Sequence, residues 1–295
     1  MKRVKHHFMP QFYLKYFTND NGYYHVFDKK HNKFKNDPQS PKTSFYEYNR
    51  NTIKINNINT DFIEKTYSRF ESDFARFINY ITSNHYEIEI VESRSMIHVL
   101  KCYISFQFWR LPQHDIYIDR VIRNIDYNLC RNMLTDKNGK NVLCEDYMIE
   151  LINDDKHFRH YFRCFILPCL LFNLFSNDDD VEKWRIYNTE KDTRFSFICS
   201  DVPIIYNNLA DFFMFKGNIL FPLTKNRILM IAKKEYPDYF PDSFWAYINM
   251  VLYEQSNRYF TVLDKQYLFE LMDIYKDMEK INMTSLFRDS LFQFV

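Results

Sequence analysis

The first seventeen residues constrain this chain more than any other stretch, because they are aromatic and apolar where most chains begin with a polar, frayed end. From its fifth residue the chain reads Lys5-His6-His7-Phe8-Met9-Pro10-Gln11-Phe12-Tyr13-Leu14-Lys15-Tyr16-Phe17. A beginning of this composition has to pack against the rest of the molecule. The adjacent imidazoles of His6 and His7 are then held close to the segment that receives them, and we expect a site there.

Two long apolar stripes with spacings of three and four residues predict amphipathic helices. The first helix begins after Asp61, and its expected buried face consists of Ile63, Tyr67, Phe70, Phe74, Phe77 and Ile81. The second spans about 92–111 and stops before Pro112. Its expected buried face consists of Ile97, Leu100, Ile104, Gln107 and Leu111. Further helices are expected over 113–131, 145–175, 243–256 and 265–280.

Short aromatic and β-branched runs predict strands. The run 23–27 and a partner strand starting at Phe34 predict an N-terminal β-hairpin that carries the histidine pair, while 36–59 is expected to be mostly loop. Four more strands are expected over 184–187, 195–199, 218–221 and 227–231. The fold class is therefore α+β, a largely helical body with a small antiparallel sheet and an N-terminal β-hairpin. We expect a single domain, 1–295, with the sub-regions 1–60 (hairpin and loop), 61–176 (helical), 184–232 (small sheet) and 243–295 (C-terminal helices).

The composition excludes several classes of function. Only three glycines occur, far apart, so the phosphate-cradling loops of Walker-type NTPases, kinases and Rossmann folds are excluded. The formal net charge is +1, so no global field steers the chain toward nucleic acid, although a local basic patch stays open. The six cysteines form no Cys-x-x-Cys pair and are expected to be reduced thiols. Without an apolar leader or a run long enough to span a bilayer, a cytoplasmic protein with no membrane partner is expected.

Polar side chains interrupt the apolar stripes, and such local violations are expected at functional sites. Gln107 lies on a buried stripe and Arg110 one turn later, so both need polar partners. Glu71 at a stripe edge and Asp201 at a strand end offer carboxylates. The candidate catalytic residues are His7, Glu71, Arg110 and Asp201, and the candidate substrate-binding residues are Gln11, Glu64 and Gln107. We expect the four catalytic candidates to converge, with Gln107 bridging Arg110 to a carboxylate.

The opening motif His6-His7-Phe8-Met9-Pro10-Gln11-Phe12-Tyr13-Leu14 resembles a bacterial family catalogued as domain of unknown function 4238. Further marks of the resemblance, in order, are Ser40-Pro41-Lys42, Tyr46, Ile63-Glu64, Phe70-Glu71, Gln107 to Pro112, Phe197 to Pro203 and Phe221 to Thr224. One departure is Val202, where a polar residue is more usual. The resemblance implies a bacterial accessory protein, in some members linked to defence against phage, and no assigned chemistry.

Two functions from different classes follow from this pattern. In the first, the protein is a defence or toxin effector that acts as a metal-dependent hydrolase of the nuclease or phosphoesterase type, with a divalent metal such as Mg or Mn at the polar cluster. In the second, the cluster is a structural polar core, and the protein is a non-catalytic binding module. A sealed, internally satisfied network favours the second function, and a solvent-reachable cavity lined by the cluster favours the first. The sequence is compatible with binding to nucleic acid, with binding to a protein partner and with an oligomer.

Histidines elsewhere in the chain are weaker candidates. His157 and His160 could clip a metal from one helix face, but the neighbouring Arg159 and Arg163 repel a cation, so a solvated face is expected. His114 follows Arg110 by four residues, one short of the Arg-x-x-x-x-His spacing of HEPN ribonucleases.

Overall fold

The computed structural model describes residues 3–55, 58–83, 88–90, 93–124, 138, 159–160, 162–174, 181–190, 196–232, 235–237 and 240–295. The helices are α1 (Gln11–Lys15), α2 (Phe62–Ser83), α3 (Arg94–Arg110), α4 (Asp115–Asn124), α8 (Leu167–Leu171), α9 (Leu209–Phe213), α10 (Asp242–Gln255), α11 (Lys265–Lys280) and α12 (Ser285–Phe294). The strands are β1 (Lys5–His7), β2 (His25–Asp28), β3 (Lys33–Phe34), β4 (Tyr46–Tyr48), β5 (Ile53–Ile55), β6 (Ile58–Thr60), β7 (Ile88–Ile90), β8 (Trp184–Asn188), β9 (Cys199–Ser200), β10 (Ile205–Tyr206), β11 (Ile219–Thr224), β12 (Arg227–Ile231) and β13 (Tyr259–Val262). The α+β class is confirmed.

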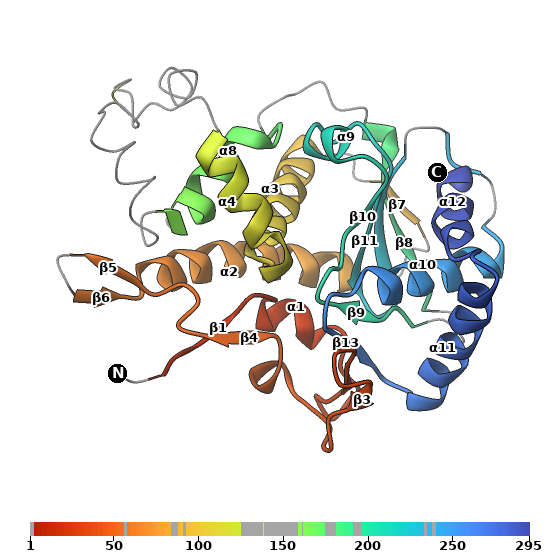
Figure 1. Ribbon diagram of the computed structural model, residues 1–295. Coiled ribbons are helices and arrows are strands. Elements are labelled where there is room, and N and C mark those ends of the chain that lie inside the picture. The colour runs from red at the N-terminus through yellow and green to blue at the C-terminus, as the bar shows by residue number, and fades with distance from the viewer. Residues whose placement is uncertain are drawn as a thin grey trace.

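A five-stranded antiparallel sheet in the order β10-β11-β12-β8-β7 lies at the centre of the molecule (Figure 1). Helix α3 packs against it from the side of the helical body, with the ring of Tyr103 5.6 Å from Phe221 of β11. The C-terminal helices lie on the other side (Figure 1), where Trp245 of α10 contacts Tyr187 of β8. The predicted bounds of β12 and α11 agree with the structure.

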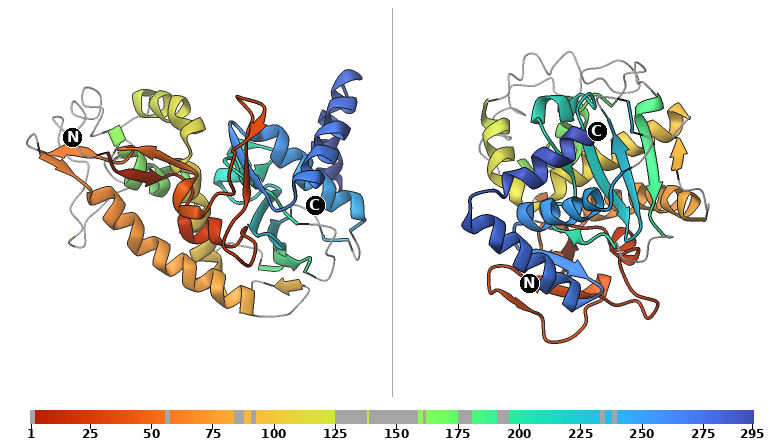
Figure 2. Two further views of the ribbon diagram at one scale, coloured as in Figure 1. Left: turned by 90° about the horizontal axis from the view of Figure 1, so that it is seen from below. Right: turned by 90° about the vertical axis from the view of Figure 1, so that its right-hand side faces the viewer.

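A second antiparallel sheet has the order β3-β2-β13-β9 and contains the predicted N-terminal hairpin, β2 with β3. The histidine pair lies outside this hairpin, on β1, which pairs with β4 in a two-stranded ribbon of its own. The segment 36–59 therefore holds strands β4, β5 and part of β6 where mostly loop was expected. The strands β2 and β3 lie beside the C-terminal part of the chain (Figure 2), and the ring of Phe34 in β3 is 5.7 Å from that of Phe269 in α11. The β1–β4 ribbon lies farther from the C-terminal helices (Figure 1).

The N-terminal motif is packed into the core, as the sequence predicts. Met9, Tyr13 and Leu14 are fully buried, and the ring of Tyr13 stacks on Phe221. The Tyr13 hydroxyl donates a 2.7 Å hydrogen bond to the carbonyl of Pro222. Helix α1 is thereby wedged between α3 and β11, and this fixes the position of the preceding histidines.

Helix α3 buries its whole predicted stripe and nearly all other residues of its C-terminal half. Helix α2 differs from the prediction, because Phe70 is 37% exposed and Ile78 is fully buried in its place. The predicted helix over 113–131 is confirmed where it is described, by α4, and the one over 145–175 by the π-helical turn Phe162–Ile166 and α8. The remaining residues of both predictions lie outside the described ranges, as do His157, Cys130 and Cys144. The four cysteines within the described ranges are free thiols. No helix in the described part of the chain is both long and apolar enough to cross a bilayer.

Candidate functional site

Strand β1 directs its two histidines to opposite faces of the β1–β4 ribbon, because successive residues of a strand alternate. Both imidazoles are nevertheless buried. The backbone N–H of Asn51 donates to His6 Nδ1 at 2.8 Å, and the side-chain amide of Gln11 lies 3.2 Å from His7 Nδ1. Burial lowers the pKa of both histidines, and for His7 the nearby Arg110 cation lowers it further. Both rings are therefore neutral hydrogen-bond acceptors at Nδ1.

Arg110, the last residue of α3, joins α2, α3 and β1. Its Nη1 lies 2.6 Å from Glu71 Oε1, and its Nη2 donates to the carbonyl of His7 at 2.7 Å. The guanidinium also lies over the ring of Tyr67, 4.3 Å from its centroid. The structure thus brings His7, Glu71 and Arg110 together. The cluster is internal, because the Arg110 side chain is almost fully buried and its acceptors belong to the chain itself.

Gln107 does not make the bridge expected from the sequence. Its amide nitrogen lies 3.3 Å from the carbonyl of Phe8 and 3.0 Å from the sulfur of Met9. The carboxamide therefore fixes the N-terminal motif on α3 instead of linking Arg110 to a carboxylate. The physical reason is the fully buried position of Met9, which places the backbone of the motif directly against the glutamine.

Asp201 does not join the cluster either, which corrects the expected four-residue convergence. Its carboxylate accepts the backbone N–H groups of Asn257, Arg258 and Tyr259 at 2.8 Å each, and the hydroxyl of Ser256 at 3.1 Å. Burial raises the pKa of Asp201, and the four donors act in the opposite direction. The side chain holds the turn between α10 and β13, a structural role that three consecutive amides explain completely.

Replacement Asp201→Asn is expected to lower the free energy of unfolding by about 2 kcal/mol, because an amide NH₂ would face backbone donors that need an acceptor. Urea unfolding at pH 7 measures the effect. The matched control is Asp264→Asn at the N-cap of α11, where the side chain accepts from Gln266 and asparagine caps equally well. Equal stability of the Asp201 variant and the native protein would contradict the structural role.

Glu64 and Asn51 connect the motif to a second group of charged residues. The Asn51 amide donates to Glu64, and Glu64 lies 4.0 Å from His6. The side-chain oxygen Oδ1 of Asn51 accepts a 2.9 Å hydrogen bond from Arg163. Arg163 lies in the π-helical turn Phe162–Ile166, an irregularity that often occurs at functional sites.

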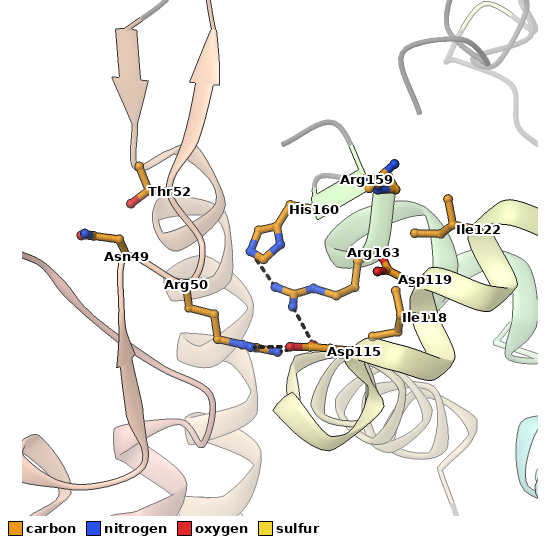
Figure 3. A pocket seen from close by; sticks show the side chains of 10 residues that line it. All are labelled: Asn49, Arg50, Thr52, Asp115, Ile118, Asp119, Ile122, Arg159, His160 and Arg163. Atoms are coloured by element: carbon orange, nitrogen blue, oxygen red, sulfur yellow. Dashed lines mark hydrogen bonds and ion pairs between the residues drawn. The ribbon is translucent and has the colours of Figure 1, made fainter. Parts of the chain in front are cut away.

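A polar pocket of about 360 Å³ opens beside this group (Figure 3). Its lining residues are Asn49, Arg50, Thr52, Asp115, Ile118, Asp119, Ile122, Arg159, His160 and Arg163. Arg50 and Arg163 reach Asp115 from opposite sides, and the Arg163 guanidinium contacts His160 at 2.9 Å (Figure 3). We call this cavity the Asp115 pocket.

Arg50 ties the Asp115 pocket to the buried motif. Its Nη2 donates to the carbonyl of Arg110 at 3.1 Å and to Asp115 Oδ1 at 2.7 Å. The second guanidinium nitrogen reaches the other Asp115 oxygen at 3.0 Å, so the pair is bidentate. The polar residues of the N-terminal motif and of α3 therefore form the wall behind the pocket and hold its charged groups in place.

The lining of the Asp115 pocket is rich in charged side chains. It holds three guanidinium groups against two carboxylates. The Arg50 and Arg163 side chains are almost fully buried, and both share the half-exposed carboxylate of Asp115. A guanidinium fork matches the oxygens of phosphate or carboxylate, which makes arginine the usual residue for binding them.

The sequence prediction missed Arg50, Asp115 and Arg163 as site residues. The only indication of the pocket in the sequence is that Arg159 and Arg163 flank His160, and this pattern predicts a solvated helix face. In the structure His160 is half-buried in the pocket. His114 stacks on Phe108 at 3.9 Å, and burial lowers its pKa to about 4, so it is a neutral packing residue.

A metal site of three or more His, Cys, Asp or Glu side chains does not occur among the residues that the structure describes. The imidazole nitrogens Nδ1 of His6 and His7 are both engaged by donors of the chain. The polar cluster of His7, Glu71 and Arg110 offers a single carboxylate, paired with a guanidinium, and this donor set does not fit Mg²⁺ or Mn²⁺.

The fold and the site define an α+β protein with a buried polar network behind an arginine-lined pocket. A profile described as protein of unknown function (DUF4238) matches residues 5–265, and the chain belongs to this family. No match was found among curated proteins or among solved structures.

Proposed function

We propose that the protein is a binding module whose Asp115 pocket takes a small phosphate-bearing anion. The observation that carries the proposal is the pair of buried guanidiniums, Arg50 and Arg163, that converge on one shared carboxylate at the wall of an open cavity. Arg50 also pairs with Glu47 at 2.8 Å, but Glu47 does not line the pocket. Within the lining, three guanidinium groups face two carboxylates, and this excess of positive charge favours an anion. The volume of about 360 Å³ suits a diphosphate or a nucleotide-sized ligand.

The hydrolase expected as the first function receives less support. The polar residues that interrupt the apolar stripes are engaged within the chain, with Arg110 held by Glu71 and by the carbonyl of His7. The atoms His7 Nε2, Gln107 Oε1 and Arg110 Nε have no hydrogen-bond partner among the described residues, but all three are buried and therefore out of reach of a substrate. The geometry therefore favours the binding module, with the polar core as its scaffold.

Pyrophosphate is the probe that tests the pocket. Titration calorimetry at low ionic strength is expected to show binding to the native protein. Arg159→Ala is expected to weaken it about tenfold, because a guanidinium of the lining is lost. The matched control is Arg69→Ala, which removes an exposed arginine of α2 outside the pocket and should leave the affinity unchanged.

Asp115→Asn is expected to change affinity and stability in opposite directions. Loss of the shared carboxylate frees Arg163 for the anion and leaves Arg50 paired with Glu47 alone, so pyrophosphate binds about tenfold more tightly. The ligand-free variant melts at a lower temperature than the native protein, because the buried Arg163 guanidinium loses its carboxylate and Arg50 loses one of its two. Added pyrophosphate restores its melting temperature by mass action.

Three results would overturn the proposal. They are no pyrophosphate binding to the native protein, equal losses in the Arg159 and Arg69 variants, and weaker binding by Asp115→Asn. Release of orthophosphate from pyrophosphate with added Mn²⁺, abolished by Arg159→Ala, would replace the binding module with the hydrolase.

A further inference from the structure

One face of the β1–β4 ribbon carries two tyrosines with cations beside them, and the buried, neutral His7 lies at its inner end. Lys5 pairs in register with Tyr48, and His7 with Tyr46, so these four side chains share one face. The Lys5 ammonium lies 4.3 Å from the ring centroid of Tyr46, and the Arg3 guanidinium lies 5.6 Å from that of Tyr48. The two tyrosine rings are themselves 5.4 Å apart.

The pattern continues onto the neighbouring sheet through Tyr259, the first residue of β13. Lys35 and Arg258 each lie over this ring, at 5.1 and 4.6 Å. Tyr46 lies between the ribbon and this second sheet. A hydrogen bond from Tyr48 and the charges of Lys5 and Lys35 lower the pKa of its hydroxyl. We call this surface the tyrosine–cation strip; its members are Arg3, Lys5, Lys35, Tyr46, Tyr48, Arg258 and Tyr259.

The strip carries an excess of positive charge. Arg3, Lys5 and Lys35 form no ion pair with a carboxylate within the described ranges, whereas Arg258 pairs with Asp28. Glu47 lies between Tyr46 and Tyr48 in sequence but faces the other side of the ribbon, where it pairs with Arg50. Three cations without an ion pair in the described part of the chain therefore lie beside partly exposed aromatic rings, of which Tyr48 is 49% exposed. Of the three, Lys35 lies close enough to Asp28 for this carboxylate to act on its pKa.

We propose that the tyrosine–cation strip binds single-stranded nucleic acid. Exposed aromatic rings between cations are the arrangement that such ligands require, since bases stack on the rings and phosphates pair with lysine and arginine. An anionic lipid surface or an acidic peptide would use the cations, but neither has bases to stack on the rings. The strip lies on a different face of the ribbon from Glu47 and Arg50, so this binding is independent of the Asp115 pocket.

The charges predict the salt dependence of binding. Arg3, Lys5 and Lys35 correspond to about three phosphate contacts, and single strands release about 0.7 counterion per contact. The logarithm of the association constant should therefore fall with the logarithm of salt concentration with a slope of about −2. Lys5→Gln should make this slope shallower by about 0.7.

Fluorescence anisotropy with a labelled twelve-nucleotide oligothymidylate tests the proposal on the full chain. Tyr48→Ala is expected to weaken binding about tenfold, and Tyr48→Phe, which keeps a stacking face, should retain affinity within about twofold. The matched control is Tyr80→Ala, which removes an equally exposed tyrosine from α2 and should have no effect. Because Tyr48 is exposed, all three variants are expected to melt as the native protein does.

Absence of binding at 25 mM salt, or equal affinity of the Tyr48→Ala and native proteins, would overturn the proposal. Binding to phosphatidylserine vesicles that Tyr48→Ala leaves unchanged, without oligonucleotide binding, would identify a lipid surface instead. Arg159→Ala should leave oligonucleotide affinity unchanged, and Tyr48→Ala should leave pyrophosphate affinity unchanged. The experiments therefore distinguish a failure of the nucleic-acid proposal from a failure of the anion-pocket proposal.

Discussion

Removal of residues 1–17 is expected to prevent folding. The deleted segment contributes Phe8, Met9, Tyr13, Leu14 and Phe17 to the core, all nearly or fully buried. At roughly 1.5–3 kcal/mol for each side chain, their burial stabilises the protein by on the order of 10 kcal/mol. The whole stability of a globular protein is only about 5–15 kcal/mol. Soluble yield and thermal melting followed by circular dichroism measure the result.

Deletion of residues 1–3 alone is the control, and it should leave the melting temperature unchanged because Lys5 is the first residue of β1. Single substitutions in the motif test its contribution to stability in a protein that still folds. Leu14→Ala should cost about 2–5 kcal/mol, and Tyr13→Phe about 1 kcal/mol for the hydrogen bond to Pro222. A chain lacking residues 1–17 that melts with the native protein would show that the motif does not organise the fold.

The long helices could be predicted because their apolar residues recur over many turns, as in α2, where Ile63, Tyr67, Phe74 and Ile81 of the expected face are buried. The error on α2 has a geometric cause. With 3.6 residues per turn, Phe70 and Phe77 lie on one flank of the face formed by Ile63, Tyr67, Phe74 and Ile81, and Ile78 lies on the other flank. The helix turns the flank of Ile78 toward the core, and Phe70 is left to stack on Phe106 at the surface edge.

Several short strands could not be predicted from local pattern, although the hairpin of β2 and β3 could. Strands β4, β5 and β10 have two or three residues, too few for an alternation to stand out. Strand β13 is fixed by its neighbours β2 and β9 on either side, which come from distant parts of the sequence. The partners that order these residues are tertiary, so only the assembled sheet defines them.

The candidate site was partly accessible from the sequence. A buried arginine needs a carboxylate, and Glu71 at the edge of the α2 stripe was an available partner for Arg110. Asp201 looked equivalent but is satisfied by three consecutive backbone amides, and a sequence does not show where amides will converge. The Arg50–Asp115 pair joins positions 65 residues apart, and the local sequence around either residue does not indicate its partner.

Arg110→Met is expected to lower the free energy of unfolding by about 3–5 kcal/mol, because it leaves the Glu71 carboxylate and the His7 carbonyl without their donor. Glu71→Gln should cost about 2 kcal/mol, since the amide oxygen still accepts a hydrogen bond. The double variant should be more stable than the sum of the single losses by about 2 kcal/mol. Urea unfolding of the four proteins measures this coupling. The control cycle uses Arg76 and Asp73, an exposed pair on α2, whose coupling should lie within about 0.5 kcal/mol of zero.

The same variants distinguish a scaffold from a binding group. Arg110 supports the Asp115 pocket through its backbone carbonyl, which accepts from Arg50, and this oxygen survives Arg110→Met. The variant should therefore lose stability but keep pyrophosphate affinity within about threefold once it is folded, a change of less than about 1 kcal/mol. Loss of pyrophosphate binding with native stability would instead place the Arg110 side chain in contact with the ligand. In that case the buried cluster, and not the arginine pair around Asp115, would be the functional centre of the molecule.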